Sequence, residues 1–391
     1  MRSEGGAAGK AIAGVAIGTA AGIGIAAAAT GAVAVALARR VITPAVRREE
    51  DERIVAVDVP RGEIVLAATD ESLMTGRYSF CFDQDAGHAR LGEIIEQDER
   101  HVRRRIESVD FGRLERARRG RFAGFLYLGP WELGHPYENV TVDTPVGPAP
   151  AWRIEPEEPS DDWCIQVHGR GTRRRETIRA VPVFRAAGWN SLLVSYRNDG
   201  EAPDSEDRRY GLGGTEWADV EAAVRFAVEH GARRVLLMGW SMGGSIALQA
   251  VLRSAYVREH VLGVVLDSPA VDWADILRFQ GEQLGFPPAL ADVVARVLGS
   301  GLCRGLTGAA APIDLAELDP VARADEFAVP MLLLHSVDDG FVPIAGSRAL
   351  AEARPDLVDF EVWEGARHTK LWNHDPGLWN GQIAAWLRRF A

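Results

Sequence analysis

The sequence predicts an α/β protein in which helices cover both faces of a mostly parallel sheet. Two observations lead to this fold class. From about residue 139 onward, short apolar runs alternate with helical stretches. One of these runs, residues 235–238, leads directly into Gly-Trp-Ser-Met-Gly (residues 239–243) and then into an apolar helix, which is the pattern of a strand, a sharp turn and a helix. Two further regions precede this part of the chain.

Length and composition indicate a globular protein with more than one unit. The 391 residues exceed what one compact core needs, and 47% hydrophobic with 25% charged residues is ordinary for a packed domain. A net charge of −11 disfavours a nucleic-acid-binding role, which requires a basic face. Cys81, Cys164 and Cys303 form no Cys-x-x-Cys pair, so neither a disulfide framework nor a zinc site is expected.

The first region, residues 1–47, contains a long uncharged segment. Residues 11–38 are long enough to cross a bilayer as a helix, so they predict a single-pass membrane anchor. Residues 36–38 also resemble a signal-peptide cleavage site, but the apolar stretch exceeds an ordinary signal segment, which favours an uncleaved anchor. More Lys and Arg residues follow the segment than precede it, and this asymmetry places the main body on the cytoplasmic side.

Gly14, Gly18 and Gly22 repeat at a spacing of four within this segment. On a helix they would form a groove that lets a second helix approach closely, which would give a homodimer. The alternative is that glycine is simply frequent in an Ala/Gly-rich segment.

The second region, residues 48–134, predicts a small β-rich accessory unit. Short runs at residues 54–57, 63–66, 78–82 and 122–128 have the composition of strands. The basic run at residues 101–105 could contact anionic headgroups, but acidic residues interleave with the basic ones, which favours a solvated surface. We assign no chemistry to this region.

The third region, residues 135–391, opens with a predicted hairpin around residues 145–148 and then alternates between strands and helices. Its predicted helices include residues 216–229 and 242–253. Residues 270–325 contain two further helical runs and predict a cap over the edge of the sheet. The predicted buried strands are residues 163–167, 191–196, 235–238, 261–266, 331–334 and 358–363.

Ser241 is the candidate nucleophile, because it occupies the centre of the Gly-x-Ser-x-Gly turn. This turn forces the serine into a crowded backbone conformation, so side chains at positions 239 and 243 would collide with neighbouring backbone. Serine needs a base to remove its proton, and such sheets supply an acid and then a histidine after later strands. Asp338 and Asp339 follow the strand at residues 331–334, and His368 follows the last strand. The ends of these strands meet the serine at one edge of the sheet.

Three segments together resemble the α/β-hydrolase superfamily: the turn at Ser241, the D-x-x-V-P run at residues 339–343, and Gly-Ala-Arg-His ending at His368. The match runs from about residue 137 to the C-terminus and is similar to bacterial lysophospholipase-like and serine-aminopeptidase-like hydrolases. The resemblance implies that Asp339 is the acid, with Asp338 and Asp267 as alternatives. His-Ser at residues 335–336 departs from the family's usual His-Gly but touches no triad position.

Attack on a carbonyl places negative charge on its oxygen, which backbone N–H groups can stabilise. The expected donors are the N–H groups of Met242 and Arg170. Arg170 lies in His-Gly-Arg-Gly (residues 168–171), which follows the strand at residues 163–167 and resembles the family's H-G-x motif.

Other residues near the motifs receive no catalytic role. His168 is interpreted as a structural residue of its loop, because His368 already fills the position of the base. Arg173, Arg174 and Arg175 adjoin this loop and either attract an anionic headgroup or simply solvate a helix. The remaining histidines have no partner pattern and are interpreted as surface or core residues: His88, His101, His135, His230, His260, His335 and His374.

The sequence therefore predicts a serine hydrolase that cleaves a carboxylic ester, thioester or lipid acyl bond of a small-molecule or lipid substrate through an acyl-enzyme on Ser241. A peptidase or amidase would use the same triad, and a non-catalytic binding protein with this fold is a third hypothesis. No metal and no organic cofactor is expected, because the sequence has no glycine-rich phosphate loop and no cluster of His, Asp and Glu ligands.

Overall fold

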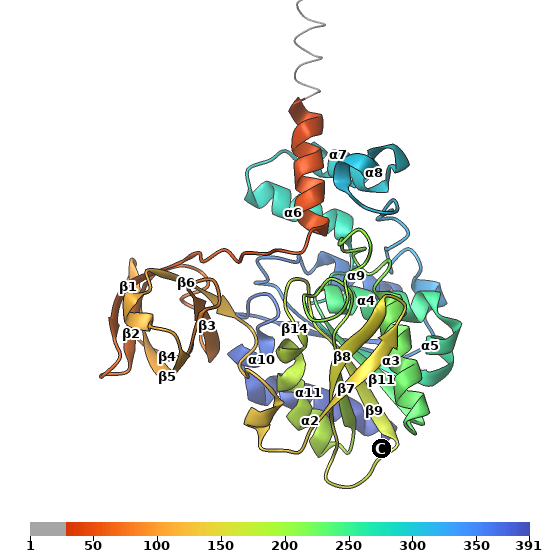
Figure 1. The fold of residues 1–391 in the computed structure, drawn as a ribbon, viewed down its shortest axis with the longest axis horizontal. Coiled ribbons are helices and arrows are strands. Elements are labelled where there is room, and N and C mark those ends of the chain that lie inside the picture. The colour runs from red at the N-terminus through yellow and green to blue at the C-terminus, as the bar shows by residue number, and fades with distance from the viewer. Residues whose placement is uncertain (1–28) are drawn as a thin grey trace, which may run out of the picture.

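The computed structural model describes residues 29–391. Figure 1 shows a small barrel beside a larger body in which helices flank a sheet, and a helical segment that stands on the larger body. The barrel is formed by residues 52–123 and the sheet by strands within residues 138–363. The barrel is thus inserted in the chain between the helical segment and the sheet.

Six antiparallel strands close the barrel in the order β1-β2-β5-β4-β3-β6. Ile64 and Leu66 of β2 are fully buried while the residues between and beside them are partly exposed, as expected for a strand with one inward face. Pairing of β1 with β6 completes the ring and removes the free edges of an open sheet. The sequence predicted strands in this region but not their closure. The strands are β1 (Glu52–Asp58), β2 (Glu63–Ala67), β3 (Tyr78–Phe82), β4 (Gly87–Gln97), β5 (His101–Phe111) and β6 (Arg119–Ala123).

Glu52 of β1 is expected to destabilise the protein at neutral and alkaline pH. Its side chain is buried and accepts a hydrogen bond from Thr69 Oγ1 (2.9 Å), but burial raises its pKa from 4.5 to about 7. Because the folded pKa lies above the unfolded one, stability falls as pH rises from about 4.5 to about 7 and stays lower above that range. Glu52→Gln should therefore raise the free energy of unfolding at pH 8 by about 1–3 kcal/mol.

Urea unfolding of both proteins at pH 8 and at pH 4 checks this expectation. At pH 4 the carboxyl is largely protonated in both states, so the variant should show little gain. An equal gain at both pH values would mean that the ionisation of Glu52 is not the cause.

The larger body is built on an eight-stranded sheet with the order β14-β13-β12-β11-β9-β10-β8-β7. The six strands from β14 to β10 run parallel, while β8 pairs antiparallel with both β10 and β7. This mostly parallel sheet confirms the predicted fold class. The strands are β7 (Glu138–Thr144), β8 (Gly147–Ile154), β9 (Asp162–Val167), β10 (Asn190–Val194), β11 (Arg234–Trp240), β12 (Val261–Asp267), β13 (Met331–Ser336) and β14 (Val358–Trp363).

Helices cover both faces of this sheet, as predicted. In β11, Val235 and Leu237 enter one hydrophobic cluster, and Leu236 and Met238 enter another. The first cluster includes residues of α3, α4 and α7, and the second includes residues of α2 and α11. The helices are α2 (Val181–Ala186), α3 (Trp217–Glu229), α4 (Met242–Arg253), α5 (Ala255–His260), α6 (Trp273–Gln283), α7 (Pro288–Gly299), α8 (Arg304–Thr307), α9 (Ala345–Ala353), α10 (Leu371–His374) and α11 (Pro376–Leu387). Short 3₁₀ segments are η1 (Leu114–Arg116), η2 (Pro130–Leu133), η3 (Arg174–Ala180), η4 (Gly301–Cys303), η5 (Ala324–Glu326) and η6 (Arg388–Phe390).

The helical residues 29–42 pack on the larger body. Ala34, Ala38 and Ile42 are fully buried, and their spacing of four places them on one face of the helix. They belong to the same hydrophobic cluster as Leu298 of α7. Figure 1 shows the helix rising from the end of the body that carries α6 and α7, two of the three α-helices inserted between β12 and β13.

The prediction of a single-pass membrane protein is contradicted. No helix within residues 29–391 is long and apolar enough to cross a bilayer. The described part of the predicted span, residues 29–38, instead buries one face against the larger body, which its Ala-rich composition also allows. Residues 11–28 of that span lie outside the described residues, as do the glycines of the expected homodimer, Gly14, Gly18 and Gly22. The cytoplasmic orientation inferred from the anchor loses its basis.

Hydrogen bonds and an ion pair fix the barrel beside the loop that follows β14. Lys370 of this loop pairs with Glu71 of the barrel (Nζ–Oε2 2.6 Å). Arg179, which is almost fully buried, donates to the carbonyl oxygen of Gly124 after β6 (2.9 Å) and to that of Thr369 (2.7 Å). The barrel therefore contributes to the surroundings of any site at this edge of the sheet.

Candidate active site

Ser241 lies at the turn between β11 and α4 with φ 51° and ψ −119°. A positive φ is uncommon for a residue with a side chain, and residues held in this way cluster at functional sites. A Cβ added to Gly239 would collide with the backbone of Gly243, and one added to Gly243 would collide with the carbonyl oxygens of Val167 and His168. These close backbone contacts confirm the prediction that side chains at positions 239 and 243 would collide with neighbouring backbone.

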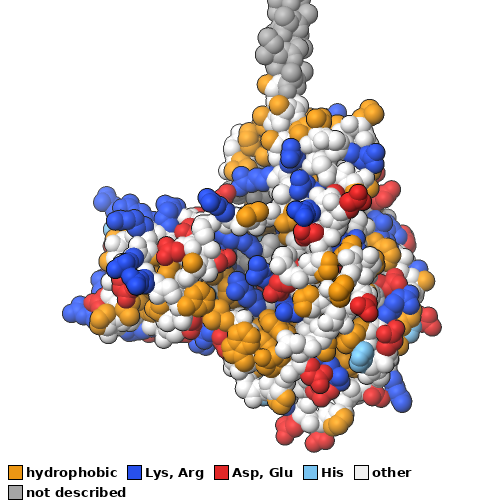
Figure 2. Space-filling view, viewed as in Figure 1, with side chains coloured by type: hydrophobic (Ala, Val, Ile, Leu, Met, Phe, Trp, Pro, Cys, Tyr) orange, Lys and Arg blue, Asp and Glu red, His pale blue; other side chains and the backbone are white. Residues whose placement is uncertain are grey.

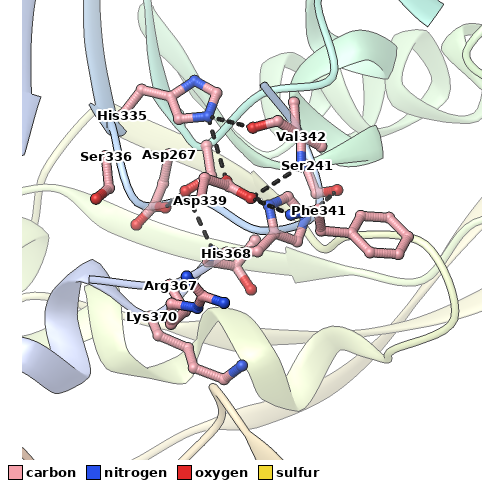
Figure 3. Close-up of polar contacts among 12 residues, drawn as sticks. Ser241, Asp267, His335, Ser336, Asp339, Phe341, Val342, Arg367, His368 and Lys370 are labelled. Carbon is pink, nitrogen blue, oxygen red and sulfur yellow. Dashed lines mark hydrogen bonds and ion pairs between the residues drawn. The ribbon is translucent and has the colours of Figure 1, made fainter. Parts of the chain in front are cut away.

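The structure brings Ser241, His368 and Asp339 into one hydrogen-bonded chain (Figure 3). His368 Nε2 lies 2.8 Å from Ser241 Oγ, and His368 Nδ1 lies 2.7 Å from Asp339 Oδ2. The side chains come from the loops after three different strands, β11, β13 and β14. Because parallel strands end at the same edge of a sheet, the serine and the histidine meet although 127 positions separate them.

Of the three candidate acids, Asp339 is the one that contacts His368. Asp338 accepts a hydrogen bond from a backbone N–H of the loop after β14 (2.6 Å). Asp267 is fully buried and accepts from Ser268 Oγ and from a tryptophan indole N–H (2.9 Å each). The geometry therefore favours Asp339 as the partner of the histidine.

Asp339 is held as an anion. Burial alone would raise the pKa of its carboxyl, but His368 and His335 outweigh burial and hold that pKa well below its ordinary value. Its other oxygen, Oδ1, accepts from the backbone N–H groups of Phe341 and Val342 (2.8 Å each). An anion that faces Nδ1 of the histidine favours the tautomer with the proton on Nδ1, so the lone pair of Nε2 faces the serine.

His335 is a site residue for which the sequence shows no partner. It is fully buried at the end of β13, and its Nε2 lies 3.2 Å from Asp339 Oδ2, the oxygen that also faces His368. Its Nδ1 lies 2.7 Å from Ser347 Oγ, which fixes the plane of the ring. The position of His335 four residues before the aspartate, at the end of an apolar strand, is the signal that could have identified it.

The loop after β9 lies directly against the nucleophile. A Cβ on Gly169 would lie 3.2 Å from Ser241 Cβ. The N–H of Gly169 already donates to Glu176 Oε2 (2.8 Å) and is not free for a substrate. The next backbone N–H along the loop that could donate to a substrate oxygen is that of Arg170. On the other side of the serine, Met242 begins α4, and the first N–H groups of a helix have no partner within it. The N–H groups of Arg170 and Met242 stay the predicted donors to a substrate oxygen.

Two side chains hold this loop in place. His168 is fully buried and its Nε2 lies 3.1 Å from Asp199 Oδ2, which fits its interpretation as a structural residue. Arg170 turns its side chain away from the loop and donates to the carbonyl oxygens of Arg40 and Val41 (2.7 and 2.9 Å). The helical residues 29–42 therefore end on the loop that carries a predicted oxyanion donor.

Ser241 and His368 line a cavity of about 930 Å³ between the barrel and the larger body. Its walls also include the turn between β3 and β4, part of β6, the loop at residues 169–173 and the segment that follows the N-terminal helix. Phe341 lies beside the imidazole of His368, with 5.2 Å between ring centroids. A cavity of this size admits a small-molecule substrate, and the barrel supplies part of its wall.

The sheet order, the turn at Ser241 and the chain order of the three side chains define an α/β-hydrolase-fold domain. Residues 165–295 match the family described as alpha/beta hydrolase fold. Residues 53–123, which form the barrel, match a family described as a domain of unknown function, DUF8805. The larger body therefore has the α/β-hydrolase fold that the sequence predicted.

The chain is similar to the uncharacterized protein YqkD of Bacillus subtilis (strain 168), with 23% identity over 230 residues that cover 57% of this chain and 70% of that protein. Among solved structures it is similar to the esterase Pf2001 of Pyrococcus furiosus, with a TM-score of 0.52 and 18% identity. That match covers 67% of this chain and 94% of the esterase. At this identity the likeness shows the fold alone.

Proposed function

We propose that the protein is a serine hydrolase that cleaves a carboxylic ester, thioester or lipid acyl bond. The observation that carries this proposal is the hydrogen-bonded chain from Ser241 through His368 to Asp339 at the wall of an open cavity. A serine oxygen beside an imidazole nitrogen, with a carboxylate anion at the other nitrogen, is the arrangement that activates serine for attack on a carbonyl.

The reaction proceeds in two halves. His368 Nε2 takes the proton of Ser241 as Oγ attacks the carbonyl carbon, and the N–H groups of Met242 and Arg170 stabilise the charge on the carbonyl oxygen. The bond to the leaving group then breaks, and the imidazolium returns its proton to the leaving oxygen or sulfur. Water, deprotonated by the same histidine, attacks the acyl-enzyme and releases the acid. Asp339 holds the ring and stabilises its positive form in both halves.

The test compares p-nitrophenyl acetate, butyrate and palmitate with the p-nitroanilide of butyrate. Release of p-nitrophenol is expected from at least one ester, and the chain-length preference separates a small-ester enzyme from a lipid-acyl enzyme. Faster cleavage of the anilide would instead support a peptidase or amidase, which would use the same triad.

Diethyl p-nitrophenyl phosphate adds a covalent test. It should attach to Ser241, be found on that residue by mass spectrometry of the digested protein, and abolish turnover. A protein that is folded by circular dichroism but neither cleaves any ester nor anilide nor takes up the phosphoryl group would favour the non-catalytic hypothesis and refute this one.

A further inference from the structure

Five arginines line the same cavity as Ser241, and one of them, Arg170, is bonded to the N-terminal helix. The other four are Arg48, Arg121, Arg173 and Arg175, which we call the arginine cluster. They come from separate segments: the stretch after the N-terminal helix, β6, and the loop and 3₁₀ segment after β9. Figure 2 shows Lys and Arg side chains gathered in the hollow between the barrel and the larger body. The fold thus gathers cationic groups from distant parts of the chain beside the candidate nucleophile.

Three of these side chains have no direct partner. Within residues 29–391, Arg48, Arg173 and Arg175 make no side-chain hydrogen bond or ion pair. The guanidinium of Arg175 lies 4.0 Å from the ring centroid of Phe125, and its buried Nε has no hydrogen-bond partner. Arg173 is exposed, but Arg48 and Arg175 are half-buried. Half-buried donors without a protein acceptor are costly in a folded protein, so a ligand that supplies acceptors would gain affinity there.

Asp85 is the carboxylate at the centre of the cluster. It pairs with Arg121 (2.6 Å). Burial would raise the pKa of Asp85, but Arg121, Arg175 and Arg48 outweigh it and lower that pKa. Several guanidinium groups therefore share one carboxylate, and the arginine cluster keeps a net positive charge.

All but one of the other acidic residues of the cavity wall are engaged elsewhere. Glu176, which also faces Arg48, accepts the N–H of Gly169. Further pairs are Glu71 with Lys370, Asp199 with His168, Glu49 with Arg40, and Asp204 with Arg208. Asp51, on the exposed rim, is the carboxylate of the wall that has no such partner within the described residues.

The arginine cluster lies close to the reacting serine. Gly169 approaches Ser241 at one end of the loop after β9, and a Cβ on Gly171 would lie 3.1 Å from Arg48 Nη1 at the other end. Two residues of chain span at most about 7 Å. An anion held by Arg48 would therefore sit on the order of 10 Å from the bond to be cleaved, a distance that a short acyl chain or a glycerol unit can bridge.

We propose that the substrate of this site is an ester that carries an anionic group, a carboxylate or a phosphate, and that the arginine cluster binds this group. The inference rests on the proposed hydrolase function and names its substrate class. Guanidinium groups match the paired oxygens of carboxylate and phosphate, and a charge-assisted hydrogen bond is stronger than a neutral one. The half-buried position of Arg175 and its stacking on Phe125 argue against the simpler interpretation that this arginine only solvates a helix.

Two matched pairs of esters test the proposal and distinguish where the anion lies. Mono-p-nitrophenyl glutarate and p-nitrophenyl valerate differ by a carboxylate on the acyl side, and 1-butyrylglycerol 3-phosphate and 1-butyrylglycerol differ by a phosphate on the alcohol side. In at least one pair, kcat/KM should favour the anionic ester by about 10- to 100-fold. The preference should weaken as salt rises, because the cavity is open to solvent.

Variants assign the preference to the cluster. Arg175→Gln and Arg48→Gln should each lower the ratio of anionic to neutral kcat/KM by about tenfold, and Arg175→Lys should restore part of it. Arg100→Gln, an exposed arginine in the turn between β4 and β5, is the matched control and should leave the ratio unchanged. Equal effects of Arg100→Gln and Arg175→Gln would show that overall charge, and not the cluster, sets the preference.

The outcomes separate this inference from the proposed function. Cleavage of both neutral esters with no preference in either pair would overturn the anion site and leave the hydrolase intact. If no ester is cleaved, the anion site is tested by binding. Calorimetry then measures whether the Ser241→Ala protein binds monomethyl glutarate or glycerol 3-phosphate. Binding that Arg175→Gln weakens about tenfold would support the anion site, and no binding of either compound would overturn it.

Discussion

Replacing Ser241 by alanine is expected to lower kcat for ester hydrolysis by roughly 10⁵- to 10⁶-fold, because no other group in the site can form the acyl-enzyme. The chain from His368 to Asp339 would remain, but it would have no oxygen to deprotonate except that of water. The residual rate would then come from binding and from the oxyanion donors alone. Release of p-nitrophenol by purified protein, measured at saturating ester, gives the ratio.

Ser300→Ala is the matched control for this experiment, since Ser300 lies at the end of α7 and outside the cavity wall. It should retain the rate of the unaltered protein. Ser241→Ala should unfold at a similar temperature to the parent, because alanine keeps the Cβ and therefore fits the same positive-φ backbone no better and no worse than serine. Wild-type turnover in Ser241→Ala would remove the nucleophile from the proposal.

Asp339→Asn is expected to lower kcat by about 10⁴-fold with little change in KM. Asparagine has nearly the same shape, so the fold and the substrate cavity should persist. Its neutral amide, however, no longer favours a proton on His368 Nδ1, and the histidine then presents the wrong tautomer to the serine. The amide also removes the charge that stabilises the imidazolium during reaction. Steady-state kinetics with the preferred ester measure both parameters.

Asp338→Asn and Asp267→Asn complete this comparison. Asp338 faces a backbone N–H that an asparagine oxygen can still accept, so its replacement should change kcat by less than about tenfold. Asp267 is bonded to Ser268 and a tryptophan, so its replacement should affect stability more than kcat. A larger kcat loss in either of these variants than in Asp339→Asn would reassign the acid.

Stability against pH gives an independent check on Asp339. Its folded pKa is depressed, so its charge stabilises the protein above the ordinary aspartate pKa, and this stabilisation is lost as pH falls below that value. The difference in the free energy of unfolding between the parent and Asp339→Asn should therefore be largest at neutral pH and shrink below about pH 4.

The sheet and the serine turn could be predicted from sequence because their signals are local. A buried parallel strand has an unbroken run of apolar residues in its sequence. The strand predicted at residues 163–167 accordingly differs from β9 by one residue. The steric demand at the turn is also local, since it fixes glycine at positions 239 and 243. The choice among Asp267, Asp338 and Asp339 depends instead on loop geometry, which only the family resemblance anticipated.

The remaining features depend on contacts between distant segments. Closure of the barrel pairs Glu52 with Gly120, and no local sequence pattern predicts such a pairing. The uncharged residues 29–38 have a composition that suits either a bilayer or a protein surface. The burial of one face, marked by Ala34 and Ala38, becomes apparent only in the structure. The residues of the arginine cluster are likewise distant in the sequence. Neither the hydropathy pattern nor a motif predicts that they meet in one cavity.

The bonds from Arg170 to the end of the N-terminal helix have a mechanical consequence. Tension applied to the protein through its N-terminus would pass along the helical residues 29–42 to the carbonyl oxygens of Arg40 and Val41, and from these to the loop beside Ser241. Tension applied at the C-terminus would enter through α11, on the opposite face of the sheet. A surface-immobilised preparation would thus respond differently to load according to which end of the chain is attached.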